Sequence, residues 1–198
     1  MIIIETTPFD VNYINILNLK SRKEFRDWLQ TNHKIQSECW VNVKRGKPCG
    51  DDFFWYVDAI EEALCFGWID SKHKTILGNH MQRFSPRKPG SHWTELNKER
   101  VKRLKKLGLM TKSGFSVVPA ETNFIMDPDV ERQMKLSMCW EEFKKFPDLY
   151  KKIKIGNISF YKKRDPKIYK RMLFRLIEQT KKGKMFGEWN DYGRLLLY

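Results

Sequence analysis

The stretch at residues 53–67, FFWYVDAIEEALCFG, constrains the fold of this chain more than any other segment. At about 100° per residue, its apolar side chains cover nearly the whole helical circumference, which predicts a helix at the centre of a domain. Gly67 is placed to end that helix in a left-handed conformation, and the Trp-Ile pair after it predicts a strand. Glu61 falls among apolar side chains, so we expect it to have a cationic partner or a shifted pKa.

The segments around this helix predict a small antiparallel sheet. Residues 38–46, ECWVNVKRG, alternate apolar and polar side chains in the manner of a half-buried strand. Residues 68–77 and 80–87 flank Gly78-Asn79, a pair typical of two-residue hairpin turns. Three further expectations concern the N-terminal part: a strand or arm at residues 2–9, an amphipathic helix at residues 21–33, and a cap for the central helix at Asp51 or Asp52.

Residues 91–108, SHWTELNKERVKRLKKLG, predict an amphipathic helix capped by its first serine and ended by its last glycine. Its apolar side chains fall within an arc of about 140° on a helical wheel. Asn97 and Arg100 lie in the same arc, so we expect both to point toward the protein interior. The other charged side chains, Glu99 among them, are expected to be solvated.

Short helices are predicted from residue 127 onward, at residues 127–137, 139–153 and 165–183. The last of them begins with an Asp-Pro pair, a usual cap and first-turn combination, and one of its faces is basic. The candidates on that face for contact with a polyanion are Lys167, Lys170, Arg171 and Arg175. The aromatic tail at residues 185–198 is expected to dock on the body of the protein or on a second subunit, forming a homodimer.

Together these patterns predict an α+β protein: a small antiparallel sheet of about three strands packed against helices, followed by a helical C-terminal subdomain. We expect the α+β core to cover residues 1–118. The helical subdomain, with its basic surface and aromatic tail, is expected over residues 119–198. No repeat and no low-complexity tract interrupts this division.

Net charge is the strongest compositional indication of a partner. Lys and Arg outnumber Asp and Glu by 38 to 24, which gives a net charge of +14. Such an excess favours nucleic acid and other polyanions, although a solvated basic surface produces the same composition. Because no recognition motif is present, we expect nucleic-acid binding to be weak, electrostatic and independent of sequence. No apolar run is long enough for a membrane span or a signal peptide, so we expect a cytoplasmic location.

Cysteine and histidine are too scattered to predict a metal or cofactor site. The four cysteines form no C-x-x-C pair, and in the cytoplasm we expect them to be reduced thiols. The four histidines are also dispersed, whereas a zinc site needs about four ligands at suitable spacing. We therefore expect neither a metal nor a cofactor.

Three segments, EEALCFGWIDS, RFSPRKPGSHWTELNKERV and GLMTKSG, resemble the YdeI/OmpD-associated family. The resemblance covers about residues 22–115 and is looser in the C-terminal helices. The chain departs from the family pattern at His80-Met81, where an acid and an aromatic residue are expected, and in its aromatic tail. The family is associated with bacteriocin protection and resistance to cationic antimicrobial peptides, so the resemblance implies a role of that kind. Because a protein of charge +14 repels cationic peptides, we expect that role to be indirect.

Polar side chains attached to buried elements form the candidate ligand site: Glu61, Asp70, Arg83, Arg87, Asn97 and Arg100. In one hypothesis the arginines hold an anion, the asparagine orients it, and a carboxylate acts as base or counter-ion. In the other, the same groups form a structural network in which Arg100 pairs with Glu61 or Asp70. The first hypothesis predicts a binding protein for a phosphate-bearing molecule or nucleic acid. The alternative is an enzyme acting on a small anionic substrate, for which the sequence identifies no catalytic residue.

Overall fold

The computed structural model describes residues 15–50, 53–76, 78–121 and 123–198. The expected strand at residues 2–9 and the expected caps Asp51 and Asp52 lie outside these residues. The chain divides into two compact units, Met1–Arg87 and Lys88–Tyr198, and each is described by itself. The division between the two units falls between residues 87 and 88 of the chain. The sequence analysis expected a domain boundary at residue 118, and that boundary stays a prediction.

The described part of unit 1 contains a four-stranded mixed sheet in the order β1-β2-β4-β3. The strands are β1 (Ile16–Leu17), β2 (Cys39–Asn42), β3 (Trp68–Ile76) and β4 (Asn79–Pro86). The hairpin of β3 and β4 is confirmed, and Gly78 takes the left-handed φ of 76° that its turn requires. The predicted turn residue Asn79 is instead the first residue of β4, where it pairs with Ile76. The sequence predicted a purely antiparallel sheet. This part of the prediction is wrong, because β1 pairs with β2 in parallel. β1 was missed because two residues are too few to show an alternating pattern.

A β-bulge in β3 decides which side chains share a face of the sheet. Asp70 pairs with Phe84 and His73 pairs with Gln82, so two residues of β3, Ser71 and Lys72, lie opposite the single residue Arg83 of β4. In a regular strand, residues three apart in the chain, such as Asp70 and His73, would point to opposite faces. With the bulge, Asp70, His73, Gln82 and Phe84 share one face, and Arg83 lies on the other.

Two helices cover the face of the sheet that carries Phe84. They are α1 (Arg22–Asn32), capped by the Ser21 hydroxyl as predicted, and α2 (Tyr56–Cys65). Phe25 of α1 packs against Phe84 with ring centroids 5.3 Å apart, and both side chains are fully buried. α2 begins at Tyr56, three residues later than expected, but every residue from Ala59 to Cys65 is buried. The central position predicted for this helix is therefore confirmed.

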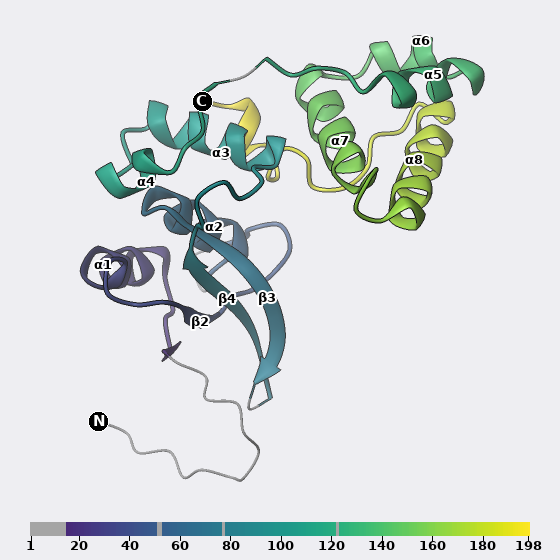
Figure 1. Cartoon of the computed structure of the whole chain (residues 1–198). Coiled ribbons are helices and arrows are strands. Elements are labelled where there is room, and N and C mark those ends of the chain that lie inside the picture. The colour runs from purple at the N-terminus through teal and green to yellow at the C-terminus, as the bar shows by residue number, and fades with distance from the viewer. Residues whose placement is uncertain (1–14, 51–52, 77, 122) are drawn as a thin grey trace. The chain divides into compact units, whose positions relative to one another are not determined.

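Unit 2 is helical in its described residues. Its elements are α3 (Glu95–Lys106), α4 (Lys112–Ser116), α5 (Pro128–Leu136), α6 (Trp140–Lys144), α7 (Asp148–Tyr161), α8 (Pro166–Lys181) and the 3-10 helix η1 (Arg194–Leu196). α5 to α8 enclose an apolar core that includes Met134, Phe143, Tyr150 and Leu176. Figure 1 shows α7 and α8 side by side in this arrangement. The aromatic tail contributes Phe186 and Trp189 to the edge of the core, so it docks within its own unit.

Helix boundaries in unit 2 correct the sequence analysis in three places. The one helix predicted at residues 139–153 is two helices, α6 and α7, because Pro147 interrupts it. α3 is capped by Thr94, whose hydroxyl accepts from the Asn97 amide, and not by Ser91. α7 continues eight residues beyond the predicted end at 153, because Ile155 and Ile158 add a further turn of buried face. The cap of α8 by Asp165, with proline at its first position, is confirmed.

The described residues therefore form an α+β fold with a helical C-terminal region, as the sequence predicted. Within the same residues, no helix combines the length and the apolar character that crossing a bilayer would require.

Candidate functional site

Glu61 finds its expected cationic partner on α1. Arg22 Nη1 donates to Glu61 at 2.8 Å, and Arg22 Nε donates to Glu62 at 2.6 Å. Arg26 adds a second donor to Glu62 at 2.7 Å, and both carboxylates are almost fully buried. Burial lowers the pKa of Arg22, but the charges of Glu62, Glu61 and Asp58 outweigh it, and the net direction is upward. This network ties α1 to α2 and is structural. The sequence analysis missed Arg22 and Arg26, although their spacing of four residues places both on one helical face.

Arg83 is held by a carboxylate on the face of the sheet opposite to Asp70. Its Nε and Nη2 both donate to Glu38, at 2.7 and 2.5 Å, and its Nη1 donates to the Ser71 hydroxyl at 2.9 Å. The pKa of Glu38 is held below its ordinary value, first by the hydrogen bonds from Arg83. An arginine that is already held on two sides by one carboxylate has little attraction left for an anion.

Asp70 and Arg87 belong to one group of interacting side chains. Tyr56 donates its hydroxyl to Asp70 at 2.7 Å. Arg87 is 7% exposed, and burial lowers its pKa to about 10, against the opposing effect of the Asp70 charge. The structure thus brings these two predicted residues together, at the end of the hairpin that is covered by helices.

Arg100 is paired with Asp191 of the C-terminal tail. Arg100 Nε and Nη2 donate to the two carboxylate oxygens at 2.6 and 2.7 Å, and Nη1 donates to Asn97 at 2.8 Å. All three side chains are buried, which confirms the predicted inward direction of Asn97 and Arg100. Asp191 was missed because it lies 91 residues away. The expected pairing of Arg100 with Glu61 or Asp70 would join the two units and stays a prediction.

The basic face expected on α8 is present. Its four predicted residues, Lys167, Lys170, Arg171 and Arg175, are all exposed, and so is Phe174 between them. Arg175 also lies 4.6 Å from the centre of the Phe186 ring, which fixes part of its side chain against the tail. This face is a convex helical surface that can contact a polyanion.

An open cleft in unit 1 gathers cations that the sequence analysis did not single out. It measures about 680 Å³, and all of its charged or ionisable described residues are basic: Lys20, Lys44, Arg45, His73 and His80. Among the described residues, no carboxylate forms an ion pair with Lys20, Lys44 or Arg45. We call this hollow the basic cleft.

Gln82 positions Arg45 at the basic cleft. The amide of Gln82 is 1% exposed, and its oxygen accepts from Arg45 Nη2 at 2.6 Å. Its nitrogen donates to the carbonyl of Lys72 in the bulge at 3.1 Å, so the bulge itself fixes the amide. The Arg45 guanidinium also lies 4.2 Å from the centre of the Tyr56 ring. Both contacts are with uncharged groups, so Arg45 is oriented while its charge is not neutralised.

The two sides of the basic cleft carry aromatic rings. Lys44 Nζ lies 3.4 Å from the centre of the Phe53 ring, and this ring is 47% exposed. On the hairpin, His73 and His80 stack with centroids 5.5 Å apart, because the register of β3 and β4 places both on the face that carries Gln82. Figure 1 shows the paired ends of β3 and β4 extending past the helices, which leaves these rings exposed.

The sequence contains a pattern that could have predicted the basic cleft. KRGK at residues 44–47 follows one predicted strand, and KHK at residues 72–74 lies inside another. Two basic clusters on strands of one small sheet are expected to lie near each other. What periodicity could not supply was the bulge, and with it the face to which His73 points.

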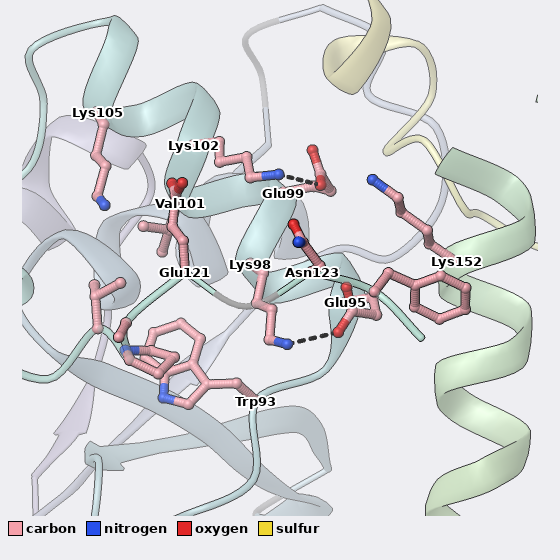
Figure 2. Close-up of a pocket in the computed structure, with 14 residues that line it drawn as sticks. Trp93, Glu95, Lys98, Glu99, Val101, Lys102, Lys105, Glu121, Asn123 and Lys152 are labelled. Atoms are coloured by element: carbon pink, nitrogen blue, oxygen red, sulfur yellow. Dashed lines mark hydrogen bonds and ion pairs between the residues drawn. The ribbon is translucent and has the colours of Figure 1, made fainter. Parts of the chain in front are cut away.

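A smaller cavity in unit 2, of about 180 Å³, is lined by α3, residues 118–121 and 123–124, and Lys152 of α7. Figure 2 shows Lys98 directed at Glu95 and Lys102 directed at Glu99. Glu99 was expected to be solvated, but it is buried, because the Tyr198 hydroxyl and Lys102 both reach it. The charges that line this cavity largely satisfy one another, so it offers less to an anion than the basic cleft does.

Metal ligands and thiols give no second site in the described residues. They contain no group of three or more histidine, cysteine or acidic side chains that could hold a metal ion. Burial raises the pKa of the Cys65 thiol to about 12 and raises that of Cys39 further, so neither thiol is a ready nucleophile.

One comparison with known proteins extends these observations. The family model for a domain of unknown function, DUF8412, matches residues 17–117, about half of the chain, and the chain belongs to this family. The matched residues include all of those that line the basic cleft. No curated protein and no solved structure matches the chain.

Proposed function

We propose that this member of the DUF8412 family binds a phosphate-bearing ligand in the basic cleft. The observation that carries the proposal is an open hollow whose described ionisable residues are all basic. Lys44 and Arg45 are held there by aromatic rings and by an amide, and none of these groups neutralises them. A phosphate group supplies the counter-charge that the described residues of the cleft do not provide, and such a site attracts it strongly.

Two of the three arginines predicted for the ligand site are less suited to this role. Arg83 and Arg100 each donate two hydrogen bonds to one carboxylate. An enzyme built on Arg83, Asn97 and Arg100 would need those carboxylates to be displaced by substrate, at a large cost in electrostatic energy. We therefore favour binding over catalysis. The cytoplasmic location and the indirect role in stress or peptide resistance stay predictions.

The test is a pair of charge-removing variants of the full chain. We expect Lys44→Ala with Arg45→Ala to weaken binding of short-chain inorganic polyphosphate and of a DNA oligonucleotide by about tenfold at low salt. The slope of log affinity against log salt should also become shallower by about 0.7 to 0.9 for each lost phosphate contact. Fluorescence anisotropy and competition measure both quantities.

Lys170→Ala with Arg171→Ala is the matched control, because it removes the same charge from the exposed face of α8. The melting temperature of both variants should stay near that of the wild type. If the α8 variant loses affinity and the cleft variant does not, the ligand binds the helix and the basic cleft is the wrong assignment. Wild-type protein that binds neither polyanion at low salt would refute the proposal as a whole.

A further inference from the structure

The basic cleft contains more than cations, and its other side chains indicate the kind of phosphate compound that it takes. A phosphate group alone needs only positive charge and hydrogen-bond donors. The cleft adds side chains that a phosphate does not use: amides, an exposed aromatic ring and the two stacked imidazoles. Its volume of about 680 Å³ also lies in the range of sites for organic ligands, roughly 300 to 1,000 Å³.

Three asparagines line the cleft, Asn18, Asn42 and Asn79, and all three are exposed. A carboxamide carries a donor and an acceptor side by side, which matches the paired donors and acceptors on the edge of a nucleobase. A site for phosphate alone gains nothing from the acceptor oxygens. Amides from separate segments therefore indicate a ligand that both donates and accepts hydrogen bonds.

Phe53 provides an apolar ring at the same site. Its ring packs edge-on against Trp55 with centroids 5.9 Å apart, and Trp55 is buried and fixes it. Phe53 is 47% exposed and lies beside Lys44 and Arg45. Its ring is a surface on which a base can stack while these two cations hold the phosphate of the same nucleotide. Lys44 Nζ covers one face of this ring, so a base has to stack on the other face, beside the phosphate that the lysine holds.

We infer that the basic cleft binds a nucleotide unit with an unpaired base, the base against Phe53 and the asparagines and the phosphate at Lys44 and Arg45. This inference rests on the proposed function and narrows its ligand class. In a duplex the base faces are stacked and their edges paired, so the ligand is a single strand or a free nucleotide.

The test compares two oligonucleotides of equal length, one with bases and one abasic, binding to the full chain. Both present the same phosphates, so the proposed function alone predicts nearly equal affinities. We expect the strand with bases to bind at least about tenfold more tightly, because stacking of one base on an aromatic ring contributes on this scale. A duplex of the same length should bind no better than the abasic strand per phosphate. A mononucleotide that competes fully with the strand would identify the free nucleotide as the ligand within the same inference.

Phe53→Ala should reduce the affinity for the strand with bases to the abasic level, while leaving the abasic affinity unchanged. Phe115→Ala is the matched control, because Phe115 is 49% exposed and has Lys105 over its ring, but belongs to α4 of unit 2. Circular dichroism and melting temperature show whether each variant is folded. Equal binding of the two wild-type oligonucleotides overturns the inference and leaves the proposed function standing. Loss of binding to both oligonucleotides in Phe53→Ala, with the fold intact, also overturns it, because the ring would then support the cations and not a base.

Discussion

Arg100 in unit 2 and Arg45 in unit 1 are both oriented by a side chain that accepts a short hydrogen bond. The acceptor for Arg100 is the buried carboxylate of Asp191, and the acceptor for Arg45 is the neutral amide of Gln82. The first arrangement neutralises the arginine and excludes water, whereas the second fixes the direction of the guanidinium and leaves its charge exposed. The charge of the acceptor, more than the arginine itself, therefore separates a structural ion pair from a candidate binding group.

The largest effect is expected from Arg100→Ala. Truncation leaves Asp191 buried without its counter-charge, which should lower the free energy of unfolding by about 3 to 5 kcal/mol. Urea denaturation followed by circular dichroism measures this change. Arg100→Leu with Asp191→Asn removes both charges together, keeps a residue that tolerates the left-handed φ of 47° at position 191, and should recover most of the loss. Lys106→Ala on the exposed side of α3 should stay within about 0.5 kcal/mol of wild type. A double variant as unstable as Arg100→Ala would contradict the comparison.

Gln82→Glu would convert the Arg45 arrangement into one like that of Arg100. A carboxylate at this position should pair with Arg45 and weaken polyanion binding by about tenfold, a loss of about 1.4 kcal/mol in binding energy. Competition against a labelled oligonucleotide measures the loss. Gln82→Met removes the hydrogen bond without adding charge and should weaken binding less. Unchanged affinity in Gln82→Glu would show that Arg45 does not contact the ligand.

Asp127 is more exposed than the Arg100 and Asp191 side chains and less exposed than Arg45. It caps α5 and accepts from Lys162 at 2.8 Å, and its side chain is 11% exposed. Burial raises the pKa of Asp127, but hydrogen bonds from Lys162 and the Asp129 amide outweigh it and hold the pKa below its ordinary value.

Asp127→Ala should lower the free energy of unfolding by about 1 kcal/mol at neutral pH. Because the folded-state pKa is depressed, this contribution is fully present above the ordinary aspartate pKa of about 3.9 and is lost as the pH falls through the folded value. Unfolding of wild type and variant at pH 7 and under acid conditions should therefore show a difference that shrinks in acid. A difference that grows as the pH falls would contradict the assigned direction.

The smallest effect is expected for an ion pair in full contact with water. Lys23 and Asp27 of α1 pair at 2.5 Å, with side chains 82% and 57% exposed. Asp27→Asn should change the free energy of unfolding by less than about 0.5 kcal/mol, and salt near 1 M should remove the difference. A change above about 1 kcal/mol would show that burial does not decide how much these ion pairs contribute to the free energy of unfolding.

The sequence predicted elements whose side chains repeat at a regular period and missed contacts that depend on chain geometry. α2 was placed at the centre because apolar side chains cover nearly its whole circumference, and the inward directions of Asn97 and Arg100 followed from their helical arc. The partner of Arg100 could not be derived, because Asp191 is reached only after the chain has built five further helices, α4 to α8. Likewise, the sequence shows that Lys44 and Arg45 are basic, but it does not show that a buried amide orients one and a phenyl ring contacts the other.

The bulge at Ser71 and Lys72 gives β3 one residue more than regular pairing with β4 requires. Deleting Ser71 or Lys72 would remove the bulge and return the strand to regular alternation, with every pair from His73 and Gln82 to the turn unchanged. His73 and Thr75 would stay on the side of Gln82, but the Gln82 amide would lose the bulge carbonyl that fixes it. The length of β3 at this one place therefore controls the direction of Arg45, although Arg45 belongs to another segment of the chain.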